Sequence, residues 1–508
     1  MSDEYIFGAH ILEILTRGMY EDPRTIFREY VQNSCDAIDS AVKKGILQAG
    51  EGQINIWLDD DTRTITISDN GTGIRSSDFR RVMESIADSD KRNNENRGFR
   101  GIGRLCGMAY CKTVIFTSKF KGENVISRLE CNGGVLSQLL QERDSGIQRY
   151  TASEVLAEIN EFSEERTNET DAHYFIVELE NINKENTALL DNYSDVKDYL
   201  LYTVPLPYSI TFDPFTAEIY AHVQELGLRI DEYNISLNDE QLFKPYTSTY
   251  HTSKGDDRIS RLEFHDIRDK NGNLTAWMWF GVSSFIASID RNYLMRGIRI
   301  RKGNIQIGDT LTMQRFFKEE RGNNYFIGEL FCVSDGLIPN SQRDYFNENP
   351  ERAEFDSAMR EYGIEFLHNV YYKGSTLNNL YRDIKQSERT ATDIQYRINH
   401  GYYKDAESRE KANAELRQAE TERESEQKKF DKISASCDIL HTVAGNIQIR
   451  DKQLLQMGGG SLKHSKPKPK YTQNEQKLIR KVFDIIDAEL GNLASSVVKK
   501  IREGLGLE

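Results

Sequence analysis

The sequence lacks the patterns that mark several large protein classes. Its 508 residues include six cysteines, and no two of them form a CxxC pair, so neither a disulfide scaffold nor a zinc ribbon is predicted. No apolar run approaches the roughly 18 residues that cross a bilayer. The N-terminus has no basic segment followed by an apolar one, so we expect neither a membrane span nor a secretory signal. The HExxH and GxSxG motifs are also absent, which leaves zinc proteolysis and serine hydrolysis without support.

Basic residues are outnumbered by acidic ones. Lys and Arg total 66 against 80 Asp and Glu, which gives a formal net charge of −14. A chain this acidic is not expected to coat nucleic acid or an anionic membrane over its whole surface, although a local basic patch would still allow contact. Mean hydropathy is low, at −0.62, but 10% of the residues are aromatic, which is adequate for hydrophobic cores. We therefore expect a cytoplasmic, reduced protein with several domains.

Hydrophobic periodicity predicts an α/β (α+β) fold. Residues 24–44 carry apolar side chains at helical spacing, and the alternating segments 54–58 and 65–67 flank a polar turn, which is typical of a β-hairpin. Further strands are expected at residues 113–118, 174–179, 276–282, 298–301 and 325–333.

The composition changes after residue 375. Residues 376–456 are predicted to form a polar helical region, and a long coiled coil is disfavoured because few heptad core positions are apolar. Residues 457–473 have the composition of a flexible basic linker, and 474–508 of an amphipathic helix. The apolar stripe of that helix would either pair two copies into a homodimer or pack back on its own chain.

Three polar side chains share one face of the first predicted helix. Glu29, Asn33 and Asp36 stand at i, i+4 and i+7. A carboxylate one turn before a carboxamide can hold a water molecule and a hard cation side by side, but the same spacing also occurs on ordinary solvated helix faces.

Two glycine motifs follow. Asp69-Asn-Gly71-Thr-Gly73 comes directly after a predicted strand, so its acid could accept an N–H group from a flat ligand, or the motif could be an ordinary turn. Gly98-Phe-Arg-Gly101-Ile-Gly103 leads into a predicted helix, where free backbone N–H groups can cradle phosphates. The segment 88–97 between them has no apolar residue and is either a lid whose Lys91 or Arg92 could reach the ligand or a plain surface loop.

The order ExxxNxxDA, DxGxG, GxxGxG resembles that of the GHKL ATPases, which include gyrase, heat-shock chaperones, histidine kinases and MutL. The resemblance implies a Bergerat-fold ATPase sandwich over residues 1–210 that binds ATP and Mg²⁺. Within it, Glu29 would be the general base, Asn33 would give Mg²⁺ its one protein oxygen, and Asp69 would recognise the adenine amino group. The whole nucleotide site would comprise Asn33, Asp36, Ala37, Asp69, Gly71, Gly73, Ile74, Lys91, Gly98, Phe99, Arg100, Gly101, Ile102 and Gly103.

This chain departs from the family pattern at two positions. Ala172-His173-Tyr174 stands where the family often has Gly-Thr before a late strand, and Ile74 stands where the chaperones usually have methionine. We therefore expect the adenine side of the site to differ in detail from that of the chaperones.

A second resemblance indicates a branch within the GHKL ATPases. Residues 332–346, CVSDGLIPNSQRDYF, are similar to the segment of the ninety-kilodalton heat-shock chaperones that ends in Asn-x-x-Arg, matched here by Asn340 and Arg343. The resemblance implies a middle domain, residues 211–375, whose Arg343 reaches the γ-phosphate. A structural pair between Arg343 and a neighbouring aspartate is the alternative.

These features lead to two main hypotheses. The first is an ATP-driven, chaperone-like clamp on a protein client or partner complex. The second is a MORC- or MutL-like ATPase switch in a nucleic-acid-linked or phage-defence complex, which the basic linker allows. A nucleotide-sensing scaffold with negligible turnover is a third, but the carboxylate of Glu29 disfavours it.

Overall fold

The computed structural model describes most of the chain up to residue 457. The described residues are 7–18, 22–86, 103–144, 146, 150–185, 187–190, 192–403, 405–457, 478, 481–483, 485, 486, 489 and 497–501. Among them, the helices are all too short or too polar to cross a bilayer. All six cysteines are free thiols.

The chain divides into two compact units. One contains residues 1–376 and 436–446, and the other contains residues 377–435 and 447–508. The predicted linker, 457–473, lies almost wholly outside the described residues, as does much of the predicted helix 474–508.

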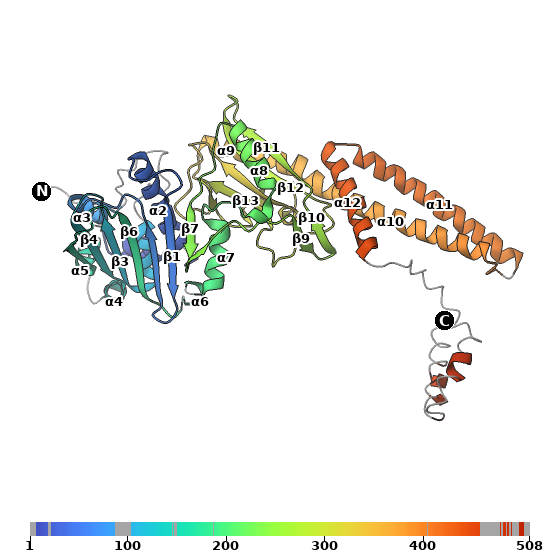
Figure 1. Ribbon diagram of the computed structural model, residues 1–508, viewed down its shortest axis with the longest axis horizontal. Helices are drawn as coiled ribbons and strands as arrows, with labels where there is room; N and C mark the ends of the chain where they lie inside the picture. Colours follow the sequence, from blue (N-terminus) through green and yellow to red (C-terminus); the bar gives the residue numbers. More distant parts are fainter. Residues whose placement is uncertain are drawn as a thin grey trace. The chain divides into compact units, whose positions relative to one another are not determined.

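The first unit begins with an eight-stranded sheet (Figure 1). Its strands are β1 (Gln53–Asp59), β2 (Thr64–Asp69), β3 (Cys111–Lys119), β4 (Val125–Asn132), β5 (Asn160–Arg166), β6 (Tyr174–Ile182), β7 (Asn234–Leu237) and β8 (Glu240–Gln241). They lie in the order β5-β4-β3-β6-β2-β1-β7-β8. Because β7 pairs in parallel with β1, this sheet includes strands that follow residue 210, the predicted end of the ATPase domain.

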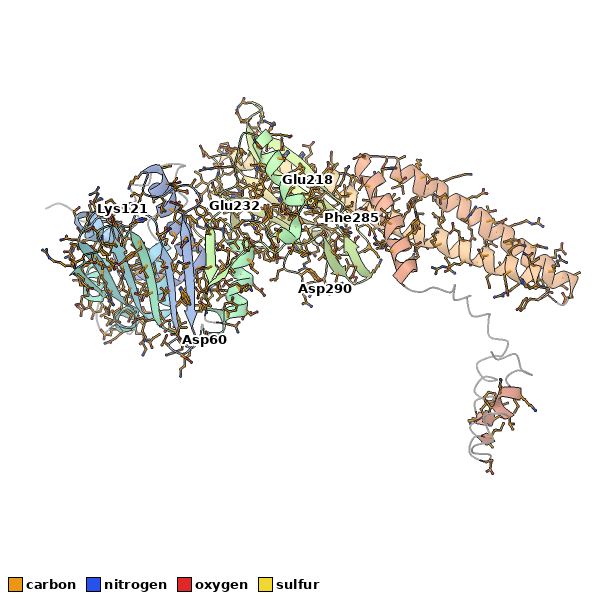
Figure 2. All side chains as sticks on the ribbon, viewed as in Figure 1. Asp60, Lys121, Glu218, Glu232, Phe285 and Asp290 are labelled. Carbon is orange, nitrogen blue, oxygen red and sulfur yellow. The ribbon has the colours of Figure 1, made fainter. Side chains whose placement is uncertain are left out.

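The predicted hairpin is confirmed as β1 and β2. Ile54, Ile56 and Leu58 are buried at every second position of β1, as expected for a strand with one face on a core. The turn between the strands is exposed at Asp60 (Figure 2). The core that these side chains join continues through β3 and β6, which are the strands predicted at 113–118 and 174–179.

Helices cover this sheet. They are α1 (His10–Glu13), α2 (Thr25–Lys43), α3 (Ser76–Glu84), α4 (Gly133–Asp144), α5 (Ala152–Ile159), α6 (Thr187–Leu190) and α7 (Tyr193–Thr203). The predicted helix 24–44 is confirmed as α2, which contacts β1, β2 and the 3₁₀ helix Gly103–Ala109. The buried hydroxyl of Tyr30 accepts a 3.2 Å hydrogen bond from the backbone N–H of Gly107, so α2 holds the second half of this 3₁₀ helix in place.

A second sheet follows in the same unit. After α8 (Phe215–Glu225), its strands are β11 (Arg261–Arg268), β12 (Leu274–Val282), β13 (Gly297–Lys302), β14 (Ile305–Ile307) and β15 (Ile327–Cys332), and β9 (Thr249–Thr252) pairs separately with β10 (Gly255–Arg258). The order is β11-β12-β15-β13-β14. The strands predicted at 276–282 and 298–301 are confirmed, and the one predicted at 325–333 begins two residues later, at Ile327, because the 3₁₀ helix Glu320–Tyr325 precedes it.

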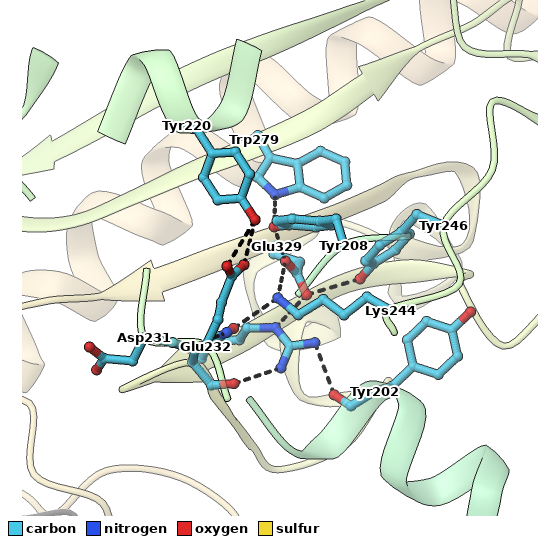
Figure 3. Close-up of polar contacts among 11 residues, drawn as sticks. Tyr202, Tyr208, Tyr220, Asp231, Glu232, Lys244, Tyr246, Trp279 and Glu329 are labelled. Atoms are coloured by element: carbon cyan, nitrogen blue, oxygen red, sulfur yellow. Dashed lines mark hydrogen bonds and ion pairs between the residues drawn. The ribbon is translucent and has the colours of Figure 1, made fainter. Parts of the chain in front are cut away.

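A buried charged cluster joins α7 to the second sheet (Figure 3). Glu329 of β15 is fully buried and forms ion pairs with Arg301 of β13 and, at 3.0 Å, with Lys244. The Tyr246 hydroxyl donates to the same carboxylate at 3.1 Å. Arg301 also donates to the carbonyl oxygen of Tyr202 in α7 at 2.9 Å. Buried charges are tolerated only when they are paired and hydrogen-bonded, so this cluster fixes α7 against the second sheet.

The remaining helices are α9 (Pro350–Glu361), α10 (His368–Asn399), α11 (Ala406–Ser434) and α12 (Asp438–Met457). The region predicted as helical, 376–456, contains most of α10, all of α11 and most of α12. In the second unit, the Tyr381 hydroxyl of α10 donates to Asp451 of α12 at 3.1 Å. The predicted α/β (α+β) class with a helical C-terminal region is therefore confirmed.

Candidate functional site

α2 carries the three polar residues that the sequence singles out. The Glu29 and Asp36 side chains are buried, and Asn33, one turn after Glu29, is half-buried. The apolar face of α2, which includes Ile26, Phe27 and Val31, packs into the core and fixes the direction of the polar face. Asn33 therefore keeps partial access to solvent beside the buried carboxylates.

The end of β2 meets the same helix. Asp69 is buried, and its Oδ1 accepts a 2.8 Å hydrogen bond from the backbone N–H of Gly71. A Cβ atom on Gly71 would lie 2.6 Å from the Cβ of Ala37 and 2.7 Å from Asp69 Oδ1, so only glycine fits. The structure therefore brings together Ala37, Asp69 and Gly71, three of the residues predicted to hold the nucleotide.

The next two positions fix the loop against β3. Gly73 has a φ of +61°, and a Cβ atom there would lie 2.1 Å from the carbonyl oxygen of Lys119. The backbone N–H of Ile74 donates to Ser118 Oγ at 2.7 Å, and its half-buried side chain packs against the core. Gly73 and Ile74 thus hold the loop after Asp69 close to the sheet.

Gly103 reaches Glu29 directly. A Cβ atom on Gly103 would lie 2.7 Å from Glu29 Oε2, so the chain enters the 3₁₀ helix in contact with this carboxylate. The other residues predicted for the phosphate loop and its lid lie outside the described residues, and their roles stay predictions. They are Lys91, Gly98, Phe99, Arg100, Gly101 and Ile102.

Arg343 comes to the same carboxylate from the second sheet. It lies in the loop after β15, and its Nε is 2.9 Å from Glu29 Oε1. Its backbone has a φ of +56°, which is uncommon for a residue with a side chain, and its carbonyl oxygen accepts a 2.8 Å hydrogen bond from Gly308 N–H. The neighbouring Asp344 accepts a hydrogen bond from the Asn340 side chain.

Sequence reasoning missed a second guanidinium at this carboxylate. Arg28 places its Nε 3.6 Å from Glu29 Oε1, and its Nη2 donates to the carbonyl oxygen of Gln342 at 3.1 Å. Glu29 is therefore held between two arginines. Arg28 directly precedes Glu29 in the sequence. Only the folded structure, in which the loop at Gln342 docks on α2, shows that Arg28 and Arg343 approach the same carboxylate.

His173 is the other residue with an unexpected position. Its Nδ1 lies 2.9 Å from the carbonyl oxygen of Gly71, so the ring donates a hydrogen bond to the loop that carries Asp69. The departure from the family pattern at Ala172-His173-Tyr174 was the signal in the sequence.

Cys106, beside this site, is suited to packing rather than to chemistry. Burial raises the pKa of the Cys106 thiol well above its usual range, and the charge of Glu29 raises it further. The thiol therefore stays protonated near neutral pH, so it is a poor nucleophile and packs as part of the core.

The model of a known protein family matches this part of the chain. Residues 21–167 match the family model described as histidine kinase-, DNA gyrase B-, and HSP90-like ATPase. The matched range includes α2, the loop after β2 and the 3₁₀ helix at Gly103, which are the elements that meet at Glu29 and Asp69.

Curated relatives match over a similar length. The chain is 26% identical to the chaperone protein HtpG of Psychrobacter arcticus over 133 residues, which cover 23% of this chain and 20% of the relative. It is 30% identical to HtpG of Francisella tularensis subsp. novicida over 142 residues, covering 24% of this chain and 23% of the relative. The matches thus span about a fifth of the length of these relatives.

Proposed function

We propose that this chain, whose residues 21–167 form an ATPase domain of the GHKL superfamily similar to that of HtpG, binds ATP with Mg²⁺ and hydrolyses it slowly to drive a chaperone-like clamp. The observation that carries the proposal is the contact between Arg343 and Glu29. It joins a carboxylate of the first sheet's helix to a guanidinium of the loop that follows the second sheet.

The residues around Asp69 suit an adenine nucleotide. The buried Asp69 carboxylate can accept a hydrogen bond from the adenine amino group, and Gly71 and Gly73 contribute no side chains at two positions of the loop beside it. Asn33 would supply one oxygen to Mg²⁺, which when bound neutralises charge on the phosphates. The position of Gly103 against Glu29 would bring the phosphate loop next to the catalytic carboxylate.

In the proposed mechanism, Glu29 accepts a proton from the attacking water. A positioned general base of this kind contributes roughly 10² to 10⁴ in rate. Arg343 would donate hydrogen bonds to the phosphoryl oxygens on which charge builds up, so it would act only when its loop is docked on α2. ATP turnover would then be coupled to the placement of the loop after β15, as a clamp requires.

The partner side of the proposal rests on the relatives. Both HtpG relatives are named chaperones, so we propose that the ATP cycle acts on a protein client or partner complex. A cytoplasmic location and a homodimer formed through residues 474–508 belong to the same proposal. A nucleic-acid switch is the competing function.

Steady-state ATP hydrolysis tests the catalytic part. The wild type should show slow turnover that requires Mg²⁺, and Glu29→Ala should lose it by at least about a hundredfold while still binding ATP. Glu164→Ala, an exposed glutamate on β5, is the control and should behave as wild type. Undiminished turnover in Glu29→Ala would overturn the assignment of the base.

A client assay tests the clamp. ATP should change how well the wild type suppresses aggregation of a chemically unfolded test protein. The Glu29→Ala variant should bind ATP in this assay but should not complete the hydrolysis cycle. Tight DNA binding that weakens steeply with salt, together with no effect on the unfolded protein, would instead favour the nucleic-acid switch.

A further inference from the structure

A cavity of about 690 Å³ lies at the N-terminal end of α2, within the first unit. α7, β13 and the loops at 308–315 and 342–344 form its other walls. Among the described residues of the predicted nucleotide site, Asn33, Asp69, Gly71 and Gly73 stay outside the lining, so the cavity does not include the predicted adenine and Mg²⁺ positions and shares only Arg343 with that site. Its most numerous charged side chains are five arginines: Arg24, Arg28, Arg299, Arg315 and Arg343.

Arg299 is the most unusual of these arginines. It lies on β13, is 3% exposed, and forms no ion pair with a carboxylate in the described part of the chain. Its Nη1 donates to Gln306 Oε1 at 3.1 Å and its Nη2 to the carbonyl oxygen of Leu294, but among the described residues its buried Nε has no hydrogen-bond partner. Its guanidinium also lies 4.3 Å from the centre of the Tyr202 ring, and burial lowers the pKa of Arg299.

Arg28, on the opposite wall, has the same feature. It is 6% exposed, and within the part of the chain that the structure describes its Nε has no hydrogen-bond partner, although this atom lies 3.6 Å from Glu29 Oε1. Burying a charged group with an unpaired donor costs free energy, and a negative charge in the cavity beside both guanidinium groups would offset that cost.

The acids at the cavity do not neutralise these two groups. Asp22 pairs with Arg24 at 2.8 Å. Asp309 accepts a 3.0 Å hydrogen bond from Thr312 Oγ1, and Asp344 accepts one from the Asn340 side chain. The fourth, Asp198, is exposed to solvent.

Arg315 adds a third guanidinium at the exposed edge of the cavity. Its guanidinium lies 3.8 Å from the centre of the Tyr345 ring, and this stacking holds the side chain in place. Arginine forks of this kind recognise phosphate groups through paired hydrogen bonds.

We propose that this cavity binds a phosphate-bearing small molecule, with Arg28 and Arg299 as its buried contacts and Arg315 at its entrance. The cavity volume lies within the range of about 300–1,000 Å³ that is usual for small-molecule sites, so an oligophosphate or the phosphates of a nucleotide would fit. Because Arg28 and Arg343 line the cavity and also contact Glu29, occupancy would compete with the pairing of that carboxylate. Only this last consequence depends on the proposed function.

Calorimetric titration of the full-length protein with pyrophosphate tests the site. The wild type should bind, and Arg299→Met, which replaces a buried cation by an apolar side chain, should weaken binding at least tenfold. Arg315→Gln should also weaken binding, and because this side chain is exposed the variant should fold normally. Arg268→Gln, an exposed arginine of β11 outside the cavity, should bind as wild type.

A second titration distinguishes the source of the phosphate. In an Asp69→Asn background, ADP binding that depends on Arg299 would identify nucleotide phosphates, and pyrophosphate binding alone would identify a free oligophosphate. If neither ligand binds in a manner that depends on Arg299 and Arg315, the proposal is wrong. ATP hydrolysis that depends on Glu29 would be unaffected by that outcome, so the two proposals fail separately.

Discussion

Arg343 lies in the loop after β15 of the second sheet, and Glu29 lies on α2 beside the first sheet. Even so, Arg343 Nε is 2.9 Å from Glu29 Oε1. Glu29 is fixed by α2, whose apolar face is buried in the first core. Arg343 is fixed by a loop whose backbone is held by Gly308, in the second half of the same unit. Because each residue is held by a different core, the contact between the carboxylate and the cation depends on how the two cores are docked.

Arg343→Ala should lower the kcat of ATP hydrolysis by about a hundredfold, the cost of removing one hydrogen-bond donor at a developing negative charge. ATP affinity should change little, because Asp69 and the glycine loop remain. The measurement is steady-state kinetics combined with equilibrium binding of ATP. Arg321→Ala, an exposed arginine of the same half that pairs with Glu319, is the control. A kcat equal to that of wild type would rule out a catalytic role for Arg343.

Part of this arrangement could be predicted from the sequence. The period of 3.6 residues defined α2, and the alternation of Ile54, Ile56 and Leu58 defined β1. The parallel pairing of β1 with β7 could not be predicted, because β7 has four residues and its partner is far away in the sequence. Short strands carry too little periodic signal, and their pairing is decided by tertiary packing.

The candidate site was predictable to a similar extent. The spacing of Glu29, Asn33 and Asp36 follows from helical geometry, so their shared face could be read from the sequence. The contact of Arg28 with the loop at Gln342 depends on how two distant segments dock, and no local pattern encodes it.

Asp69→Asn should reduce ATP affinity by at least about tenfold, the effect expected when a charged hydrogen-bond acceptor is replaced. The carboxamide can still accept the hydrogen bond from Gly71 N–H, so the loop should keep its shape while the group that faces adenine changes. Isothermal titration with ATP measures the effect. Asp61→Asn, in the exposed turn between β1 and β2, serves as the matched control. Equal affinities in Asp69→Asn and wild type would contradict the adenine assignment.

His173→Ala should weaken ATP binding by about threefold to tenfold, which corresponds to the loss of one ordinary hydrogen bond. His173 does not need to touch the nucleotide for this effect, since it donates to the Gly71 carbonyl and thereby positions the loop. His173→Gln, which keeps a donor, should recover part of the affinity. The same titration with adenosine in place of ATP should show a similar ratio, and a change confined to ATP would place the effect at the phosphates instead.

Glu329→Gln should destabilise the first unit by about 3–5 kcal/mol, because removing one partner leaves buried cations uncompensated. Arg301 and Lys244 both pair with this carboxylate, and burial, reinforced by Arg301, already lowers the pKa of Lys244 to about 7. Tryptophan fluorescence follows the change, since Trp279 donates a hydrogen bond to Tyr208 within the cluster. Glu240→Gln, which removes the partner of Lys197 in an exposed pair, should cost far less.

The same carboxylate predicts the acid response of the protein. Burial opposes ionisation of Glu329, but the charges of Arg301 and Lys244 outweigh it and hold its pKa at about 2, below the ordinary 4.5. The unfolded chain therefore takes up this proton more readily than the folded protein does. The stabilising contribution is complete above pH 4.5 and is lost as the pH falls from 4.5 towards 2. Glu329→Gln lacks this contribution at every pH, so the difference in thermal stability between it and the wild type should shrink across that window. A difference that stays constant from neutral pH down to the lower end of the window would show that Glu329 is not the group that titrates.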